Sequence, residues 1–341
     1  MKKIFLIILS VGLVLSIYPQ TKVGTTAANF LTIPVGPRAS AMGGAFTSIA
    51  NDATTSYWNA SGLSRLTRNE FVASTASWLV GTKLNWISLA FKFDDDDAVG
   101  ISINQLDYGE ELITTADEPN GVGENWSASD IAVGVSYARN LTDRFSIGGT
   151  VKYITQRIWN ESASAFALDV GLLFYTQLEG LRLGMNISNF GTEMQLAGKD
   201  LLQPIDIDPA HAGNNSNISG NLQTDSWPLP LTFTVGVSYD FLNNEDWRFT
   251  TAVDAVIPNN QSTYGNVGLE LVWANLVSLR GGYQSIGTQN FSSTIQNDPY
   301  GLTAGVGVQY DFGAFYAKFD FSYSSFGIFD PVYRYALSVG L

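Results

Sequence analysis

The chain has 341 residues, a formal net charge of -13, one histidine and no cysteine. The lack of cysteine excludes disulfides, thiol catalysis, cysteine-based metal sites and a lipoprotein anchor. The acidic charge argues against a nucleic-acid partner, because neutralising phosphates requires Lys and Arg. Charged residues make up 14%, against about 25% in typical soluble domains, and aromatic residues reach 13%. This balance suits a chain with a lipid-facing surface.

The first twenty residues have the features of a secretory signal peptide. Lys2 and Lys3 precede an apolar run of about 14 residues, which is shorter than the ~20 residues of a membrane-spanning helix. We therefore predict a signal peptide over residues 1–20. Because no later apolar run reaches about 18 residues, the remaining way to cross a bilayer is a closed β-barrel, in which strands pair all backbone groups.

Residues 21–69, termed the hatch segment below, are small and polar and precede strand-like sequence. We predict that this segment fills the lumen of a barrel; the alternative is a periplasmic tail with one amphipathic helix. Glycines would let the backbone pass close to the wall, polar residues would cap short helices or turns, and two aromatic residues would wedge against the wall. The glycines are Gly43 and Gly44, the polar residues are Asn51, Asp52 and Asn59, and the aromatic residues are Tyr57 and Trp58.

From residue 70 onward, apolar and polar residues alternate with a period of two, as Ile147, Val151 and Tyr153 do against Thr150 and Lys152. A soluble sandwich would alternate too, so the spacing of the segments is more informative. There are about fourteen segments, most about ten residues long, as tilted membrane strands require. They begin near Glu70, Leu84, Ala98, Ser129, Arg144, Ala163, Leu181, Leu229, Trp247, Tyr264, Val277, Tyr300, Ala314 and Val332.

The connections between these segments alternate in length. Tight polar links follow the even-numbered segments, at 93–97, 139–143, 176–180, 243–246, 273–275 and 311–313. Mostly longer loops follow the odd-numbered ones, notably 108–128, 190–228 and 287–298. This asymmetry, with an even strand count, is typical of outer-membrane barrels. We predict an all-β fold: a transmembrane antiparallel β-barrel of about 14 strands over 70–341, in contact with bacterial outer-membrane lipid.

Two sets of side chains are expected at particular places in such a barrel. Aromatic residues near strand ends would lie at the bilayer interfaces, namely Trp86, Trp126, Trp247, Trp273 and Tyr310. Charged residues on the polar face would line the lumen, where their mixed signs suggest ion pairs that hold a plug rather than solvated pore walls. They are Lys152, Asp169, Arg182, Asp254, Glu270, Arg280, Lys318 and Asp320.

Residues 30–66 resemble the N-terminal signature of the PorV/PorQ family, within the wider fold of FadL-like long-chain fatty-acid transporters. Segments 38–46, 50–53 and 57–63 match the family pattern, although Asn51 replaces an acidic residue and Ala60 and Ser61 replace Pro and Ala. The resemblance implies a monomeric 14-stranded barrel with an N-terminal hatch. The motif residues are Arg38, Met42, Gly43, Gly44, Asn51, Asp52, Tyr57, Trp58, Asn59 and Gly62.

The resemblance implies two alternative functions. Proteins that resemble PorV act in type IX secretion, binding the C-terminal signal domains of exported proteins and shuttling them between a translocon and the attachment machinery. Loops 108–128 and 190–228 would then form the partner surface. A FadL-like barrel would instead transport a hydrophobic small molecule, with an apolar cavity below the loops. In that case the glycine-rich stretches 280–284 and 305–313 would be kinks that open the wall, or else close-packing sites beside the plug.

The residue patterns favour no enzyme, cofactor or metal site. His211 lies in a polar loop, and no Ser lies in a G-x-S-x-G motif. The run 94–97 of four aspartates lacks the residue order of a calcium loop and reads as a solvated periplasmic turn. Glu110 and Glu111 lie in a loop with no second carboxylate pair at a defined distance, so glycosidase chemistry is unsupported.

Overall fold

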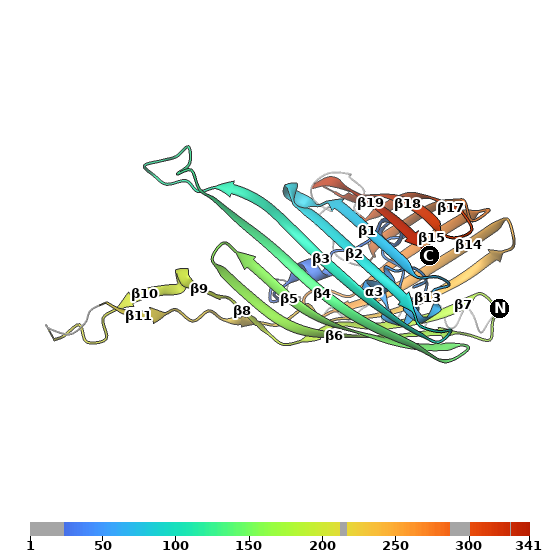
Figure 1. The fold of residues 1–341 in the computed structure, drawn as a ribbon, viewed down its shortest axis with the longest axis horizontal. Coiled ribbons are helices and arrows are strands. Elements are labelled where there is room, and N and C mark those ends of the chain that lie inside the picture. The colour runs from blue at the N-terminus through green and yellow to red at the C-terminus, as the bar shows by residue number, and fades with distance from the viewer. Residues whose placement is uncertain (1–23, 212–216, 287–300, 328) are drawn as a thin grey trace.

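The structure is a computed structural model that describes residues 24–211, 217–286, 301–327 and 329–341. The predicted signal peptide and the predicted loop 287–298 lie outside the described residues. Within them, fourteen long strands form a closed antiparallel barrel (Figure 1). The strands are β1 Glu70–Ser77, β2 Lys83–Lys92, β3 Asp97–Leu112, β4 Asn125–Thr142, β5 Phe145–Ile158, β6 Glu161–Tyr175, β7 Leu181–Gly191, β13 Thr232–Asn243, β14 Trp247–Pro258, β15 Tyr264–Trp273, β16 Val277–Ile286, β17 Leu302–Asp311, β18 Tyr316–Phe326 and β19 Phe329–Gly340.

The barrel closes where the first strand pairs with the last. The β1–β19 register runs from Glu70 opposite Gly340 to Ser77 opposite Tyr333. Each of the other strands pairs with its sequence neighbours, and β7 pairs directly with β13, so the chain between them lies outside the fourteen-stranded wall, apart from β9 Ala197–Gly198, which pairs with the start of β6. The predicted barrel of about 14 strands is therefore confirmed, and the strands begin within about four residues of the predicted positions.

The strands on one side of the barrel are longer than predicted. β3 and β4 have 16 and 18 residues, and they stay paired as far as Leu112 opposite Asn125. The loop predicted at 108–128 is therefore too long at both ends. The hydrogen-bond ladder of the hairpin continues into it, and only residues 113–124 connect the two strands. Residues 190–228 also contain short strands: β8 Met194–Gln195, β9 Ala197–Gly198, β10 Leu202–Ile205, β11 Ile218–Asn221 and β12 Ser226–Trp227.

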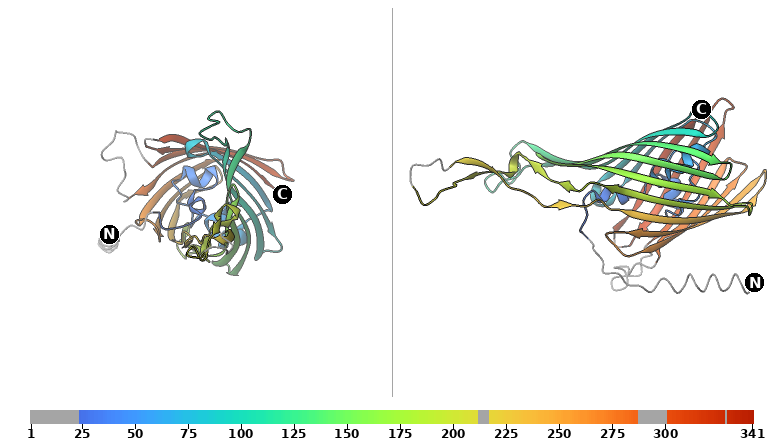
Figure 2. Two further views of the ribbon diagram at one scale, coloured as in Figure 1. Left: turned by 90° about the vertical axis from the view of Figure 1, so that its left-hand side faces the viewer. Right: turned by 90° about the horizontal axis from the view of Figure 1, so that it is seen from below.

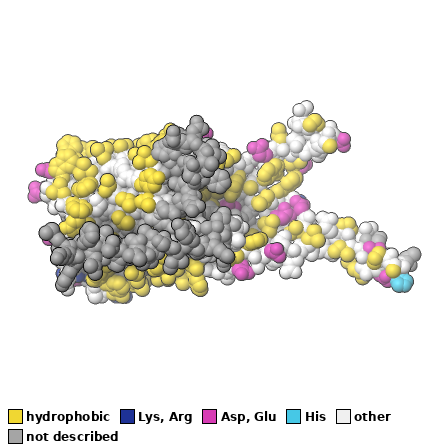
Figure 3. Space-filling model, turned by 180° about the vertical axis from the view of Figure 1, so that it is seen from behind, with side chains coloured by type: hydrophobic (Ala, Val, Ile, Leu, Met, Phe, Trp, Pro, Cys, Tyr) yellow, Lys and Arg dark blue, Asp and Glu magenta, His cyan; other side chains and the backbone are white. Residues whose placement is uncertain are grey.

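The two faces of the wall differ as the alternation predicts. Val151 and Tyr153 on β5 are exposed on the outside, whereas Thr150 is buried inside. Figure 3 shows apolar side chains over much of the barrel body on one face. An exposed apolar band of this kind is the surface that faces lipid in outer-membrane barrels.

The aromatic residues predicted at the interfaces do not all lie there. Trp247, Trp273 and Tyr310 are exposed near the end of the barrel that carries the short turns, and Trp126 is half-buried on the extension of β4. The prediction for Trp86 is wrong, because its side chain is 2% exposed and packs in the interior core. On β2, Ile87 and Leu89 take the outward positions, and strand alternation therefore turns Trp86 inward.

The hatch segment contains short helices inside the ring of strands (Figure 2). They are η2 Asn29–Thr32, α2 Pro37–Ala41, α3 Thr55–Trp58 and η3 Ala60–Arg65; η4 Leu79–Gly81 and η5 Lys199–Leu201 lie in loops. Pro37 occupies the first turn of α2, where its missing N–H leaves no hydrogen bond unmade. None of the helices in the described ranges has the length and hydropathy that crossing a bilayer requires.

The hatch segment runs through the lumen from one end of the barrel to the other. The backbone N–H of Ala28 donates to Gln156 Oε1 at 2.9 Å. Gln156 is near the end of β5 that lies at the long-loop end of the barrel. At the opposite, short-turn end, the N–H of Ala53 donates to Glu70 Oε2 at 2.8 Å. Most side chains between these points are buried. The segment therefore has its own core contacts with the inner wall, which a loose tail would lack.

Candidate functional site

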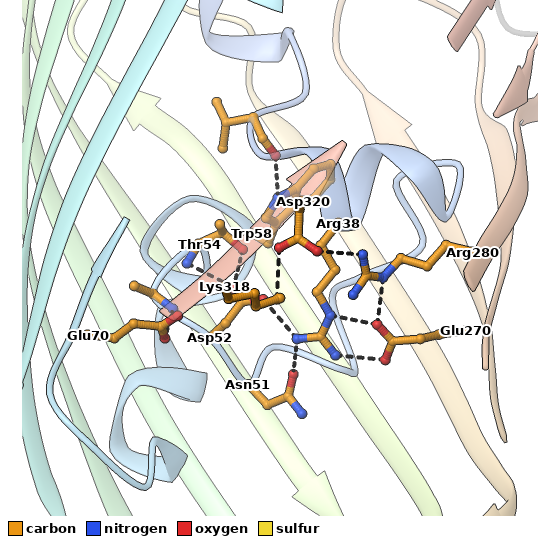
Figure 4. A network of polar contacts seen from close by, with 12 residues as sticks. Arg38, Asn51, Asp52, Thr54, Trp58, Glu70, Glu270, Arg280, Lys318 and Asp320 are labelled. Atoms are coloured by element: carbon orange, nitrogen blue, oxygen red, sulfur yellow. Dashed lines mark hydrogen bonds and ion pairs between the residues drawn. The ribbon is translucent and has the colours of Figure 1, made fainter. Parts of the chain in front are cut away.

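The lumen holds, toward the short-turn end, a network of buried charges around Arg38 of α2 (Figure 4). Its guanidinium donates to both carboxylate oxygens of Glu270 on β15, with Nε–Oε1 and Nη2–Oε2 distances of 2.8 Å. Its Nη1 donates to Asp52 Oδ2 and to Asn51 Oδ1, each at 2.8 Å. One guanidinium thus joins two parts of the hatch segment to the barrel wall.

The network continues along neighbouring strands. Arg280 on β16 donates to Glu270 Oε1 at 2.8 Å and to Asp320 Oδ1 at 2.6 Å. Lys318 on β18 lies 3.0 Å from the other oxygen of Asp320. The network therefore balances three cations, counting Arg38, against three carboxylates, counting Asp52. Buried charges are tolerated when they are paired in this way.

The charges in the hatch segment are strongly held in their ionised forms. Burial alone would raise the pKa of Asp52, but the positive charges of Arg38 and Lys318 outweigh it and hold the pKa below its usual range. Burial alone would lower the pKa of Arg38, but Glu270 and Asp52 raise it well above its usual value. Both groups therefore stay charged at every physiological pH, and the contact between hatch segment and wall is ionic.

The remaining predicted lumen charges lie around the same segment. Lys152 Nζ lies 2.8 Å from Asp169 Oδ2, and Arg182 Nη2 lies 2.6 Å from Asp240 Oδ1. Asp254 instead accepts the backbone N–H groups of Phe46 and Thr47, at 3.1 and 3.0 Å. All eight predicted residues thus line the interior, and all but Asp254 form ion pairs with other residues of the lumen.

Two buried charged residues that the sequence analysis missed also bind the hatch segment, Glu70 and Arg334. A third missed charge, Asp240, is half-buried and binds Arg182 of the wall instead. Arg334 on β19 donates to the carbonyl of Pro34 at 3.3 Å and to Ser324 Oγ at 3.0 Å, beside the ring of Trp78. The signal was present, because Asp240 and Arg334 occupy polar positions in strands that alternate cleanly.

The glycines of the motif allow close backbone contact. Gly43 has φ +65°, and a Cβ there would lie 2.8 Å from the backbone of Tyr283 on β16. Gly62 would place a Cβ 2.0 Å from the carbonyl oxygen of Ala50. Met42, which directly precedes Gly43, is fully buried, and its backbone lies against Gly268 and Gly282 of the wall. The motif therefore specifies contacts that any larger side chain would prevent.

The barrel wall also has glycines where it faces the hatch segment, and a Cβ at any of these positions would overlap the hatch segment. The set comprises Gly148, Gly171, Gly184, Gly268, Gly282 and Gly305. At Gly282 the Cβ would lie 2.3 Å from the carbonyl carbon of Met42, and at Gly305 it would lie 2.5 Å from Ala41 Cβ. Gly282 and Gly305 belong to the glycine-rich stretches 280–284 and 305–313, and there they are close-packing sites rather than kinks.

The predicted capping residues have different roles. Asn59 Oδ1 accepts the N–H of Ser61 and so caps η3, while its Nδ2 donates to the carbonyls of Thr47 and Leu172. Asp52 Oδ1 accepts the N–H of Thr54 at 3.0 Å. The prediction of a cap is wrong for Asn51, because its side-chain oxygen Oδ1 accepts a hydrogen bond from Arg38 instead.

The two aromatic residues of the motif bind the hatch segment itself. Tyr57 Oη donates to the carbonyls of Leu31 and Ile33, and Trp58 Nε1 donates to the carbonyl of Val35 at 3.1 Å. Their rings meet edge to face at 5.1 Å. Their polar atoms thus bind their own segment, while the ring of Tyr57 packs against the interior core that includes wall residues such as Trp86 and Ile154.

We expect the Asn59→Ala variant to lose about 2 kcal/mol of unfolding free energy, because a cap and two hydrogen bonds to buried carbonyls disappear together. Chemical unfolding of the detergent-solubilised protein measures this loss. Asn85→Ala is the matched control, since the Asn85 amide lies on the exposed face of β2 with a single partner, Thr75. Equal stability of the two variants would contradict the role assigned to Asn59.

The hatch segment separates two cavities that share no lining residue. The cavity below the long loops has a volume of about 270 Å³ and is lined by apolar residues such as Ile33, Trp78 and Phe326, and by polar ones such as Lys152 and Asn189. The cavity at the short-turn end has a volume of about 330 Å³ and is lined mainly by polar and charged side chains.

Residues 192–211 and 217–228, termed the arm below, project from the long-loop end of the barrel (Figures 1 and 2). β10 pairs with β11 in a sheet of two strands, with Ile205 opposite Ile218. Large apolar side chains of the arm are exposed, including Ile207 at 72%. The β3–β4 hairpin, with its tip at 113–124, projects from the same end of the barrel.

The candidate catalytic residues lie outside the charge network and the two cavities. His211 is exposed in the arm beside Asp208, and Glu110 and Glu111 are exposed on the β3–β4 hairpin. Asp94 caps its own turn, since its Oδ1 accepts the N–H groups of Asp96 and Asp97. Across the described part of the chain, no three His, Cys, Asp or Glu side chains gather as metal ligands do.

The fold has solved relatives among outer-membrane channels. The CymD monoaromatic hydrocarbon channel aligns with a TM-score of 0.55 at 12% identity, covering 92% of this chain and 97% of that one. A Pseudomonas aeruginosa FadL homologue aligns with a TM-score of 0.52 at 11% identity, covering 90% and 98%. The P. putida toluene transporter TodX aligns with a TM-score of 0.53 at 12% identity, covering 89% and 96%. At these identities the likeness defines the class of fold, a FadL-like barrel.

The family model described as type IX secretion system protein PorV matches residues 17–258. The chain therefore belongs to the PorV family. No curated protein matches the sequence. The family is one of outer-membrane barrels of type IX secretion, and family and fold together are those of transport proteins and imply an outer-membrane location.

Proposed function

We propose that this protein acts in type IX secretion by binding exported proteins that carry a C-terminal signal domain and by passing them between a translocon subunit and the attachment machinery. In this proposal, residues 1–20 direct export, the hatch segment 21–69 closes the lumen, and the barrel 70–341 holds the arm at the cell surface. The motif residues and the lumen charges act by fixing the hatch segment in place. Family membership supports the proposal.

The observation that carries the proposal is the exposed apolar surface of the arm. Ile205, Ile207 and Ile218 are exposed on a part of the chain that lies outside the barrel wall. Large apolar side chains gathered in water favour a protein interface. In addition, β10 and β11 pair only with each other among the described residues, which leaves backbone edges to which a strand of a partner can add.

The closed lumen favours binding over conduction. The ion pairs of Arg38 and the close contacts of the wall glycines join the hatch segment to several strands. A molecule that crossed the barrel would have to displace these contacts together. A protein that binds cargo at its outer surface has no such requirement.

The arm gives a direct test of this proposal. We expect the double variant Ile205→Asp, Ile218→Asp to retain about tenfold less secreted protein than the wild type, because both changes place charge in the apolar surface. The measurement is quantitative mass spectrometry of proteins bound to the tagged barrel after gentle detergent extraction from its native membrane. Leu178→Asp is the control, since Leu178 is 59% exposed in a short turn at the opposite end.

The second candidate function is FadL-like passage of a hydrophobic small molecule. It is supported by the fold and by the cavity of about 270 Å³ beside the hatch segment, which is close to the lower size limit of ligand pockets. The same extraction decides between the two. Bound secreted proteins or a translocon subunit, lost in the arm variant, support the secretion role; a stoichiometric hydrophobic compound with no protein partner favours transport.

A further inference from the structure

The cavity at the short-turn end carries a surplus of positive charge. Five cationic side chains line it, Arg38, Arg65, Arg248, Arg280 and Lys318, against three lining carboxylates, Asp52, Glu70 and Glu270, and a fourth behind them, Asp320. Its position at the end of the barrel with short turns follows from its lining residues near the starts of β14 and β16 and the end of β6. In an outer-membrane barrel, this end faces the periplasm.

The three carboxylates of this cavity already have partners. Asp52 and Glu270 bind Arg38, and Glu270 also binds Arg280. Glu70 accepts the backbone N–H of Ala53 at 2.8 Å. Within the described residues, none of the three forms an ion pair with Arg65 or Arg248, although the charge of Glu270 still acts on Arg248.

The cations differ in whether they have partners. Lys318 and Arg280 pair with Asp320, behind the cavity wall. Arg65 donates to Ser146 Oγ and to the carbonyls of Asp143 and Thr142, and its guanidinium lies 5.0 Å from the ring centre of Tyr175. These interactions hold the four side chains other than Arg248 in fixed positions.

Arg248 is the exception. It follows Trp247, which is exposed on the outer face of β14, so strand alternation points Arg248 into the lumen. Its side chain is half-buried, and it forms no hydrogen bond or ion pair with any residue that the structure describes. The residue across from it on β15 is Val272, which offers no acceptor. Withdrawing a guanidinium from water without a partner is unfavourable.

We propose that this cavity binds a small oxyanion, a phosphate or carboxylate group, and that Arg248 is its main ligand-binding residue. The guanidinium presents a planar fork of donors that fits two oxygens of an oxyanion. Ser278 and Gln309 line the same cavity, and their side chains make no hydrogen bond within the described ranges, so they supply further donors. The surplus charge of the wall attracts an anion from the periplasm. This proposal does not depend on the secretion role of the arm.

The test is calorimetric titration of the full-length protein in phosphate-free detergent with inorganic phosphate, at constant ionic strength set by chloride. We expect saturable binding by the wild type and about tenfold or more weaker binding by Arg248→Gln, because a charge-assisted bidentate contact is lost. Arg248→Lys should bind with intermediate affinity, since it keeps the charge and loses the fork. Arg144→Gln, an exposed arginine near the same end, is the matched control and should bind as the wild type does.

Thermal unfolding is a second measurement, which distinguishes a folded variant that has lost the site from a misfolded one. Phosphate should raise the thermal unfolding temperature of the wild type and leave that of folded Arg248→Gln unchanged. A parallel titration with short-chain phosphatidylglycerol below its micelle concentration distinguishes a lipid phosphate from a free anion as the source; Arg248-dependent binding of either supports the site. Absence of saturable binding of both, or equal affinities in wild type and Arg248→Gln, overturns the proposal.

Discussion

Replacing Arg38 with methionine is expected to detach the hatch segment from the barrel wall. The substitution leaves Glu270 with Arg280 as its remaining cation and removes the arginine partner of Asp52. Removing one member of a buried charge network costs about 3–5 kcal/mol, because the other members stay buried. Chemical unfolding in detergent should show this loss, and limited proteolysis should cut the variant within the hatch segment, which the wild type protects.

The control for this experiment is Arg68→Met. Arg68 forms an ion pair of 3.1 Å with Asp311 at the barrel end, where both side chains are partly exposed to solvent. Such surface pairs contribute about 0–1 kcal/mol, so this variant should unfold as the wild type does. A loss below about 1 kcal/mol for Arg38→Met, with the hatch segment still protected from protease, would show that the network does not hold the segment.

Replacing Gly282 with valine is expected to exclude the hatch segment from its present position. A Cβ at this residue would lie 2.3 Å from the carbonyl carbon of Met42 and 2.4 Å from the backbone nitrogen of Gly43. Backbone atoms cannot rotate away as the end of a side chain can, so we expect a loss of about 3 kcal/mol or complete undocking. Thermal unfolding and proteolysis of the hatch segment report the two outcomes.

The adjacent glycine supplies the matched control. A Cβ at Gly281 would have no neighbour closer than 4.0 Å, the carbonyl oxygen of Thr303. Gly281→Val places the same side chain in the same strand, but on the opposite face of the wall, where a β-branched residue suits the strand. If both variants lost stability equally, the cause would be the strand itself, and the assigned contact with Met42 would be wrong.

These contacts bear on how the barrel works. The hatch segment is bound by ion pairs, by backbone N–H groups on Asp254 and by close contact with wall glycines, and these interactions come from different strands. A single local change at the cell surface therefore has no direct route to open the lumen. This is the arrangement expected if the arm and the β3–β4 hairpin bind partners while the barrel remains sealed.

Much of the fold follows from local sequence alone. Each strand crosses between lipid and lumen, so its side chains must alternate, and the alternation shows which residues face inward whatever their partners are. The eight predicted lumen charges were identified in this way. The same rule turns Trp86 inward and places Arg334 in the lumen, whereas chemical type alone places Trp86 at the bilayer interface.

The amino-acid sequence by itself determined the strand pattern, the inward and outward faces, and the hatch motif, because each depends on residues that are neighbours in the chain. Only the tertiary structure decided the partners: Arg38 binds Glu270 across 232 residues, and Met42 meets Gly282. It also showed that Tyr57 and Trp58 bind their own segment. Pairing of this kind depends on barrel closure and on the path of the hatch segment through the lumen, which no local pattern encodes.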